Sequence, residues 1–213
     1  MRYRNIIFDL DGTIIDSEAG ITKSVQYALQ KFNIIVKDLK ELVSFIGPPL
    51  KESFMELYGF SEPQALQAII YYREYYAEHG VFDNTLYPGI EELLRKLYSE
   101  GRLLYIATTK PTIYAEEILD KYGLSNLFCY ICGANLDGTL TDKTEIIKTV
   151  LDRGGISREN TVMIGDRKHD IIGARNNKID SIAVGYGFGS EEELRSSNPT
   201  EFVKTVKSLY EVL

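Results

Sequence analysis

Two carboxylates, Asp9 and Asp11, stand where an apolar segment of the chain ends. The segment before them, Asn5–Phe8, has β-branched and aromatic residues and no charge, which predicts a short buried strand. Gly12 is expected to end this strand, so both carboxylates should lie at its carboxyl end, where ligands bind in open α/β sheets. Alternation along a strand would direct both side chains to one face, and two like charges so close require a cation, a proton or hydrogen-bond donors. An acidic turn would give the same residues, so the rest of the chain has to decide.

Further polar residues stand at the ends of expected strands and at the start of an expected helix. They are Thr108 and Thr109 after the apolar run 103–107, Lys143 before a helix expected over 144–151, and Asp166 and Asp170 after the apolar run 161–164. If the strands are parallel, all of these groups meet Asp9 and Asp11 at one edge of the sheet. Carboxylates are the ligands that Mg²⁺ takes when it also shares an oxygen with a phosphate. Hydroxyls, helix N–H groups and a lysine suit the phosphate itself, so the pattern predicts a site for both.

The remaining elements predict how these residues are brought together. From Pro88 onward, strand-like and helix-like segments alternate, which is typical of a parallel, doubly wound α/β sheet. Strands are expected at 103–107, 128–132, 161–164 and 181–184, and helices at 113–122, 144–151 and 171–176, with helices to the C-terminus. A parallel crossover needs only about a dozen residues, whereas the segment after the first strand is far longer and has helical periodicity. We therefore expect a core formed by residues 1–15 and 87–213 and a helical cap domain at 16–86, lying over Asp9 and Asp11.

Composition restricts the class of protein and its partners. The 213 residues carry a net charge of −7 with both signs mixed along the chain, so a nucleic-acid partner is not expected. No run of 18 apolar residues occurs, and Asp9 and Asp11 interrupt the N-terminal apolar patch. We therefore expect neither a membrane-spanning helix nor a secretory signal, and predict a cytoplasmic protein with no membrane partner. A monomer or a homodimer is expected.

The two cysteines, Cys129 and Cys132, form a Cys-x-x-Cys pattern. They lie in an expected strand, so their side chains should point to opposite faces. Neither His79 nor His169 is spaced to complete a zinc site with them. We expect these cysteines to pack in the core.

Taken together, the motifs resemble the haloacid dehalogenase superfamily, in particular its phosphoglycolate phosphatase-like and 5′-nucleotidase-like branches. The resemblance covers essentially the whole chain and rests on four motifs in the family's order: Asp9-Leu10-Asp11-Gly12-Thr13, Thr108-Thr109-Lys110-Pro111, Lys143 at a helix start, and Gly165-Asp166-x-x-x-Asp170. It implies a Rossmann-like core with a helical cap of the C1 type. It also implies a Mg²⁺-dependent phosphomonoester hydrolase that acts on small phosphorylated metabolites, a 5′-nucleotide or phosphoglycolate, through an aspartyl phosphate. The polar loop at 136–143 is more similar to the 5′-nucleotidase-like branch, and Arg167 stands where the family often has Ser.

The same resemblance implies a role for each residue that contacts the phosphoryl group. Asp9 matches the nucleophile, and Asp11 matches the general acid and base. Thr108 and Lys143 match catalytic residues that also bind the phosphate, and Thr109 binds it beside them through its backbone N–H. Positioning and electrostatics supply most of the catalysis in phosphoryl transfer, so each of these groups should matter strongly.

The resemblance also implies how Mg²⁺ is held. Its ligands are expected to be the carboxylates of Asp9 and Asp166 and the backbone oxygen of Asp11. Asp170 is expected to support the metal from behind these ligands, for instance through a water molecule. The second Asp-Gly-Thr of the chain, Asp137–Thr139, follows no apolar strand and is expected to be a turn.

Other functions stay open at this point. A dehalogenase of the same fold would not need Asp11 or Asp166. A phosphomutase similar to β-phosphoglucomutase would share the whole site. A non-catalytic regulatory protein that binds a phosphorylated ligand would be expected to lack part of it, and no part is missing from the sequence. Contacts with substrate also stay open for three segments: the cap turn 45–49, the residues 167–169 and the glycine-rich loop 185–189.

Overall fold

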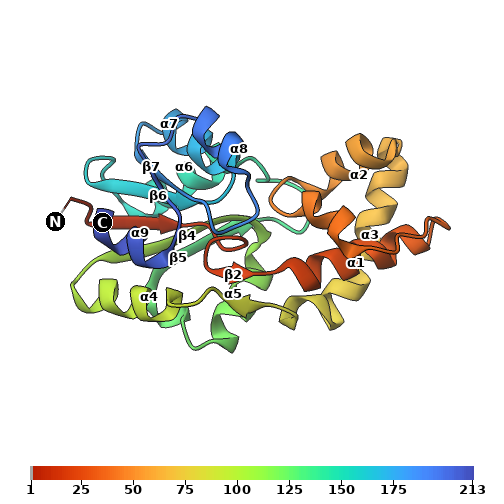
Figure 1. The fold of residues 1–213 in the computed structure, drawn as a ribbon, viewed down its shortest axis with the longest axis horizontal. Coiled ribbons are helices and arrows are strands. Elements are labelled where there is room, and N and C mark those ends of the chain that lie inside the picture. Colours follow the sequence, from red (N-terminus) through yellow and green to blue (C-terminus); the bar gives the residue numbers. More distant parts are fainter. Residues whose placement is uncertain (1) are drawn as a thin grey trace. The chain divides into compact units, whose positions relative to one another are not determined.

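A six-stranded sheet in which neighbouring strands pair in parallel forms the centre of the computed structural model, which describes residues 2–213 (Figure 1). The strands lie in the order β5 (Phe128–Ala134), β4 (Leu103–Pro111), β1 (Asn5–Phe8), β6 (Thr161–Gly165), β7 (Asp180–Val184) and β8 (Glu201–Val203). The β1 strand is fully buried, as its run of apolar residues predicts. The expected parallel α/β fold is therefore confirmed.

The order of the strands places a switch point beside β1. From β1 the chain continues to β4 and β5 on one side, and it then crosses to β6, β7 and β8 on the other side. In sheets of this kind the crossovers before and after the switch point separate, and a crevice is left at the carboxyl ends of the strands there. The residues that follow β1 and β6 are thus brought to the place where such sheets bind ligands.

Helices cover both faces of the sheet (Figure 1). They are α4 (Ile90–Ser99), α5 (Thr112–Lys121), α6 (Lys143–Gly154), α7 (Lys168–Asn176), α8 (Glu191–Ser196) and α9 (Val206–Val212), with the 3-10 turn η3 (Ser125–Leu127). The α6 and α7 helices pack against each other, and Ile146, Ile147 and Val150 of α6 join Ile7 and Met163 in one buried cluster. Burial of this apolar surface is the main force that fixes α6 on the sheet.

The chain divides into two compact units. The first contains the residues up to Asp16 together with Leu86–Leu213, and therefore the whole six-stranded sheet. The second, Ser17–Thr85, is helical: α1 (Glu18–Gln30), η1 (Leu39–Phe45), α2 (Leu50–Tyr58), α3 (Glu62–Glu78) and η2 (Gly80–Phe82). Short strands β2 (Ile15–Asp16) and β3 (Thr85–Leu86) pair where the chain passes between the units.

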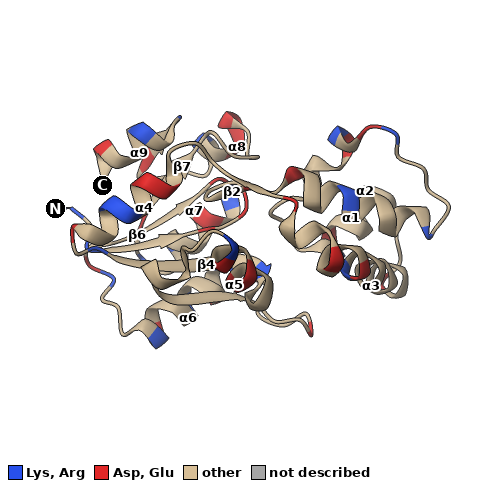
Figure 2. Ribbon diagram, turned by 90° about the horizontal axis from the view of Figure 1, so that it is seen from below, with Lys and Arg blue, Asp and Glu red and all other residues tan. Residues whose placement is uncertain are grey.

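The second unit has a core of its own. Its α1 and α3 helices pack together, and aromatic rings fill the space between its helices. The rings of Phe54 and Phe60 stack with their centroids 5.8 Å apart, and Phe45 meets Phe54 edge-on at 4.9 Å. Acidic and basic positions are interspersed along the helices of both units (Figure 2). None of the helices formed by residues 2–213 combines the length and hydropathy that crossing a membrane requires.

Several local expectations were wrong. The β4 strand continues to Pro111 because it stays paired with β5 after a shift in register, so Thr108 and Thr109 lie in a strand. Part of the C-terminal region forms β8, whose three residues are too few to show a period of two.

The cysteines and the second Asp-Gly-Thr are also settled by the structure. Cys132 is buried and Cys129 is exposed, and both are free thiols, so core packing is right for Cys132 only. Their opposite exposure agrees with their spacing of three in a strand. Asp137–Thr139 is a turn, as expected: the Thr139 N–H donates to Asp137 Oδ1 at 2.9 Å, and Gly138 has a positive φ.

Candidate active site

Asp9 and Lys143 form the centre of the site. Asp9 is the first residue after β1, and Lys143 is the first residue of α6, which crosses the face of the sheet. Lys143 Nζ lies 2.9 Å from Asp9 Oδ1 and 3.0 Å from the carbonyl oxygen of Ala107 in β4. The side chain of Asp142, just before the helix, accepts a hydrogen bond from the Glu145 N–H and so fixes the start of α6. This cap holds the ammonium at the carboxyl ends of β1 and β4.

Asp170 is the second carboxylate on Lys143. Its Oδ1 lies 2.8 Å from Lys143 Nζ, and its Oδ2 accepts the N–H of Arg167 at 3.0 Å, which caps α7. The side chain packs against the backbone of Gly165, where a Cβ would lie 2.2 Å from the Asp170 carboxyl carbon. The Gly-Asp-x-x-x-Asp spacing thus has a structural reason: the helix turn that begins after Asp166 returns Asp170 to Gly165.

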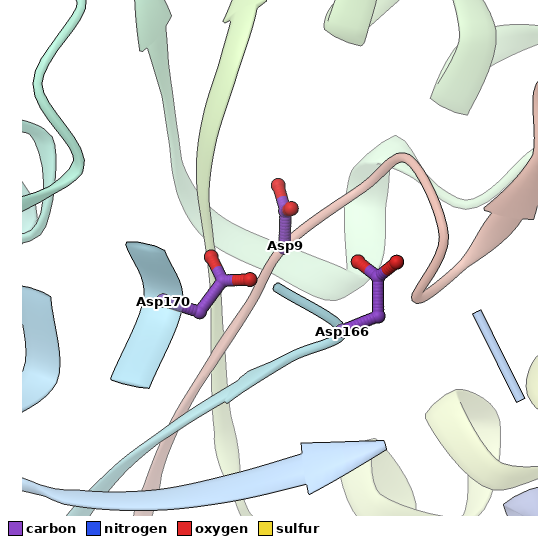
Figure 3. Close-up of side chains that lie close together, drawn as sticks. All are labelled: Asp9, Asp166 and Asp170. Carbon is purple, nitrogen blue, oxygen red and sulfur yellow. The ribbon is translucent and has the colours of Figure 1, made fainter. Parts of the chain in front are cut away.

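Asp166 completes a group of three buried carboxylates. One oxygen from each of Asp9, Asp166 and Asp170 lies within 4.8 Å of the other two, and Figure 3 shows the three side chains gathered after β1, after β6 and on α7. Asp166 has no exposed surface. Its Oδ2 accepts the Phe188 N–H at 2.8 Å, and its Oδ1 lies 3.4 Å from the Thr13 hydroxyl.

The three carboxylates of this group lie around one ammonium, that of Lys143, which contacts Asp9 and Asp170. Burial raises the pKa of Asp9 to about 6, although Lys143 opposes the shift. Burial, together with the charges of Asp170 and Asp9, raises the pKa of Asp166 well above its ordinary value. Burial lowers the pKa of Lys143, but Asp170 and Asp9 outweigh that effect and raise it overall. Three oxygen donors with excess negative charge fit a hard divalent cation such as Mg²⁺.

The carboxylate of Asp11 lies outside this group. Asp11 follows the end of β1 in a bridge with Ile15, and its Oδ2 lies 3.0 Å from Lys110 Nζ, with both side chains almost fully buried. Its Oδ1 is buried and has no hydrogen-bond partner among the described residues. The two carboxylates expected to repel each other thus pair with different lysines: Asp9 with Lys143, which also contacts Asp170, and Asp11 with Lys110. An unpartnered buried oxygen of this kind is open to a hydrogen bond from a ligand.

Thr108 and Thr109 lie near the end of β4, the strand beside β1. Thr108 is buried, and its hydroxyl oxygen is 3.3 Å from the N–H of Lys110. Thr109 is half-buried. The sheet therefore brings both threonines to the same edge as Asp9, as the parallel topology requires.

The segments whose contacts with substrate were left open by the sequence lie in different places. Arg167 Nε lies 3.0 Å from Glu193 Oε1 of α8, so its charge is directed to that carboxylate. His169 is half-buried, and burial lowers its pKa. The loop Gly185–Gly189, which follows β7, approaches Asp166 through the Phe188 N–H. The turn 45–49 belongs to the second unit.

Sequence reasoning missed two contributors to the site. Lys110 stands in the Thr-Thr-Lys-Pro motif, but no role was assigned to it. Its pairing with Asp11 follows from the adjacency of β1 and β4, in which Phe8 is in register with Ile106. The Phe188 N–H is a backbone group in a loop, and no side-chain pattern indicates it.

The sequence and the fold of this chain are similar to those of known proteins. The model of the haloacid dehalogenase-like hydrolase family matches residues 6–184. A 5′-nucleotidase from Pseudomonas aeruginosa is 47% identical over 213 residues, which are 100% of this chain and 96% of that protein. The tyrosine-protein kinase PtkA of Mycobacterium tuberculosis is 35% identical over 98% of this chain and 72% of its own. The crystal structure of a predicted phosphatase from Clostridium acetobutylicum has a TM-score of 0.97 and 46% identity, over 100% of this chain and 98% of that chain.

Proposed function

Because the chain belongs to the haloacid dehalogenase-like hydrolases, and is a phosphatase like relatives that match its whole length, we propose that it is a Mg²⁺-dependent phosphomonoesterase that forms an aspartyl phosphate on Asp9. The observation that carries this proposal is the contact of Lys143 with both Asp9 and Asp170 beside the buried carboxylate of Asp166. It supplies a nucleophile, a fixed positive charge and an acidic cluster within a few ångströms.

The first half of the reaction transfers the phosphoryl group to the protein. An oxygen of Asp9 attacks phosphorus, the bond from phosphorus to the ester oxygen breaks, and Asp11 gives its proton to the leaving alkoxide. In the second half, Asp11 takes a proton from a water molecule that attacks phosphorus, and the bond to Asp9 breaks. Inorganic phosphate leaves, and both carboxylates return to their initial states.

The surrounding residues hold the transferring group. Thr108 would donate its hydroxyl and Thr109 its backbone N–H to phosphoryl oxygens, while Lys143 neutralises negative charge that accumulates on them. Lys110 holds the Asp11 side chain through Oδ2 and leaves Oδ1 for the substrate or water. Asp9, Asp166 and the backbone oxygen of Asp11 would hold Mg²⁺, with Asp170 behind them. The cation would draw negative charge from the phosphate during transfer.

A 5′-nucleotide is the substrate that we propose first. The relative at 47% identity is named a 5′-nucleotidase, and the loop before Lys143 has the polar character noted above. In this proposal the helical unit Ser17–Thr85 acts as a cap that admits the substrate and contributes to its recognition. Phosphoglycolate is the second candidate, because a phosphoglycolate phosphatase from Vibrio parahaemolyticus is 26% identical over 98% of this chain and the core residues named above would contact only the phosphoryl group.

The test is phosphate release with Mg²⁺ from 5′-nucleotides, phosphoglycolate, hexose phosphates and p-nitrophenyl phosphate. We expect turnover with a preference for one nucleotide class, its loss in Asp9→Asn, and its loss in EDTA with recovery on addition of Mg²⁺. Unchanged activity in folded Asp9→Asn would refute the covalent mechanism. Negligible release from every substrate would favour a phosphomutase, which returns the phosphoryl group to a sugar, or a binding role.

A further inference from the structure

The loop that follows β7 packs on Asp166 more closely than its sequence indicates. We call this loop, Gly185–Gly189, the glycine strap. The Phe188 N–H donates to Asp166 Oδ2 at 2.8 Å. A Cβ on Gly187 would lie 2.5 Å from the same Oδ2 and 2.2 Å from the carbonyl oxygen of Gly12. Real Cβ atoms do not approach other atoms this closely, so glycine at 187 lets the strap backbone reach both the carboxylate and the loop after β1.

A tyrosine in the strap is bonded to the loop that carries Asp9 and Asp11. The Tyr186 hydroxyl donates to the carbonyl oxygen of Thr13 at 3.0 Å, and its ring meets the ring of Tyr87 edge-on with centroids 5.0 Å apart. Thr13 in turn points its hydroxyl at Asp166 Oδ1. The strap is therefore bonded at Phe188 to one carboxylate-bearing loop and at Tyr186 to the other.

Both bonds matter for the separation of the carboxylates. Asp9 and Asp166 follow different strands and have different partners. The Lys143 ammonium contacts Asp9, and the Phe188 N–H donates to Asp166. Their like charges push them apart. A connection across the two loops opposes that repulsion, and groups that orient metal ligands in this way change metal affinity in other proteins by about 10- to 100-fold.

We propose that the glycine strap is a positioning element: through the Tyr186 hydroxyl and the Phe188 N–H, it holds Asp166 at the separation from Asp9 that a bound Mg²⁺ requires. This inference rests on the metal site of the proposed function. It does not require that the strap contact the substrate, nor does it depend on which phosphomonoester is hydrolysed.

The experiment measures Mg²⁺ affinity without substrate, by isothermal titration calorimetry of the full chain. Tyr186→Phe removes one hydroxyl and keeps the ring on Tyr87. We expect its Kd for Mg²⁺ to rise about tenfold. The matched control is Tyr210→Phe, which removes a hydroxyl that donates to Glu100 at 2.8 Å in the same unit, and whose Kd should stay within twofold of the wild type. Gly187→Ala, which adds the clashing Cβ, should raise the Kd further where circular dichroism shows it folded.

The outcomes separate the two proposals. Equal Kd values for Tyr186→Phe and the wild type would overturn the inference, and so would a wild type that binds no Mg²⁺. A fall in kcat at saturating Mg²⁺ with no change in Kd would also overturn it, because the strap would then act on another step. If the wild type binds Mg²⁺ and Tyr186→Phe weakens that binding, but no phosphomonoester is hydrolysed, the strap inference stands and the proposed function fails.

Discussion

Replacement of Asp166 by Asn should stabilise the metal-free protein while it removes metal binding. Asp166 is completely buried, and one of its oxygens lies within 4.8 Å of an oxygen of Asp9 and of an oxygen of Asp170. At an effective dielectric constant of about 20, two unit charges at that distance interact by about 3.5 kcal/mol. Lys143 contacts both neighbouring carboxylates and offsets the charge of one. Roughly 3 kcal/mol of repulsion on Asp166 is therefore left, which agrees with the raised pKa of this carboxyl.

Asn has almost the same shape as Asp and carries no charge. Its side-chain oxygen can still accept the Phe188 N–H, and only the extra strength of a bond to a charged acceptor is lost, about 1 kcal/mol. The net expectation is a gain of about 2 kcal/mol in the free energy of unfolding. For a protein of this length, that gain raises the Tm by about 4–8 °C.

Differential scanning calorimetry in excess EDTA measures this change. Addition of Mg²⁺ at about 100 times the Kd of the wild type should then stabilise the wild type by about 2.7 kcal/mol and leave the stability of Asp166→Asn unchanged. The difference in Tm between the two proteins should therefore fall to zero or change sign. Asp152→Asn, at an exposed position on α6, is the control and should shift neither value. A lower Tm for Asp166→Asn in EDTA, or an equal response of both proteins to Mg²⁺, would refute the reasoning.

Three other predictions concern neighbouring groups. Lys110→Met should leave the Asp11 carboxylate buried and without its lysine, and should lower the free energy of unfolding by about 3 kcal/mol. Urea denaturation measures this loss. A loss under about 0.5 kcal/mol would show that the pair contributes little to stability. A second prediction concerns the pH dependence of stability in EDTA. As the pH falls from about 7.5 to about 5, the free energy of unfolding of the wild type should rise by about 1.4 kcal/mol relative to that of Asp9→Asn. The pKa of Asp9 is about 6 in the folded protein and 3.8 ordinarily, so on acidification the folded state binds the proton before the unfolded state does. The added stability is lost again as the pH rises through 6. If the difference in free energy of unfolding between the two proteins became smaller on acidification, the raised pKa of Asp9 would be wrong. Lys143→Met should reduce turnover at least 100-fold at saturating Mg²⁺, and phosphate release within tenfold of wild type would remove Lys143 from the chemistry.

Much of the fold could be predicted because its signals are local. The apolar run Asn5–Phe8 and the alternation of strands and helices after Pro88 predicted a buried parallel sheet, because strands of this kind are typical of sheets that helices cover on both faces. The short strand β8 could not be predicted in this way. Its three residues pair with β7 only because the strap and α8 bring them there.

The candidate site also has parts that could be predicted from the sequence and parts that could not. The sequence by itself determined that Asp9 and Asp166 gather, because the carboxyl ends of parallel strands share an edge and these two residues follow directly after β1 and β6. It also predicted Asp11 among them, whereas the Asp11 carboxylate lies outside the cluster and pairs with Lys110. Only the tertiary structure decided which cation each carboxylate meets. Lys110 reaches Asp11 through the register of β4 on β1, and the strap reaches Asp166 through close backbone approach at Gly187. Hydrophobic periodicity reports which residues face the core, whereas contacts between loops depend on register and distance between segments far apart in the chain.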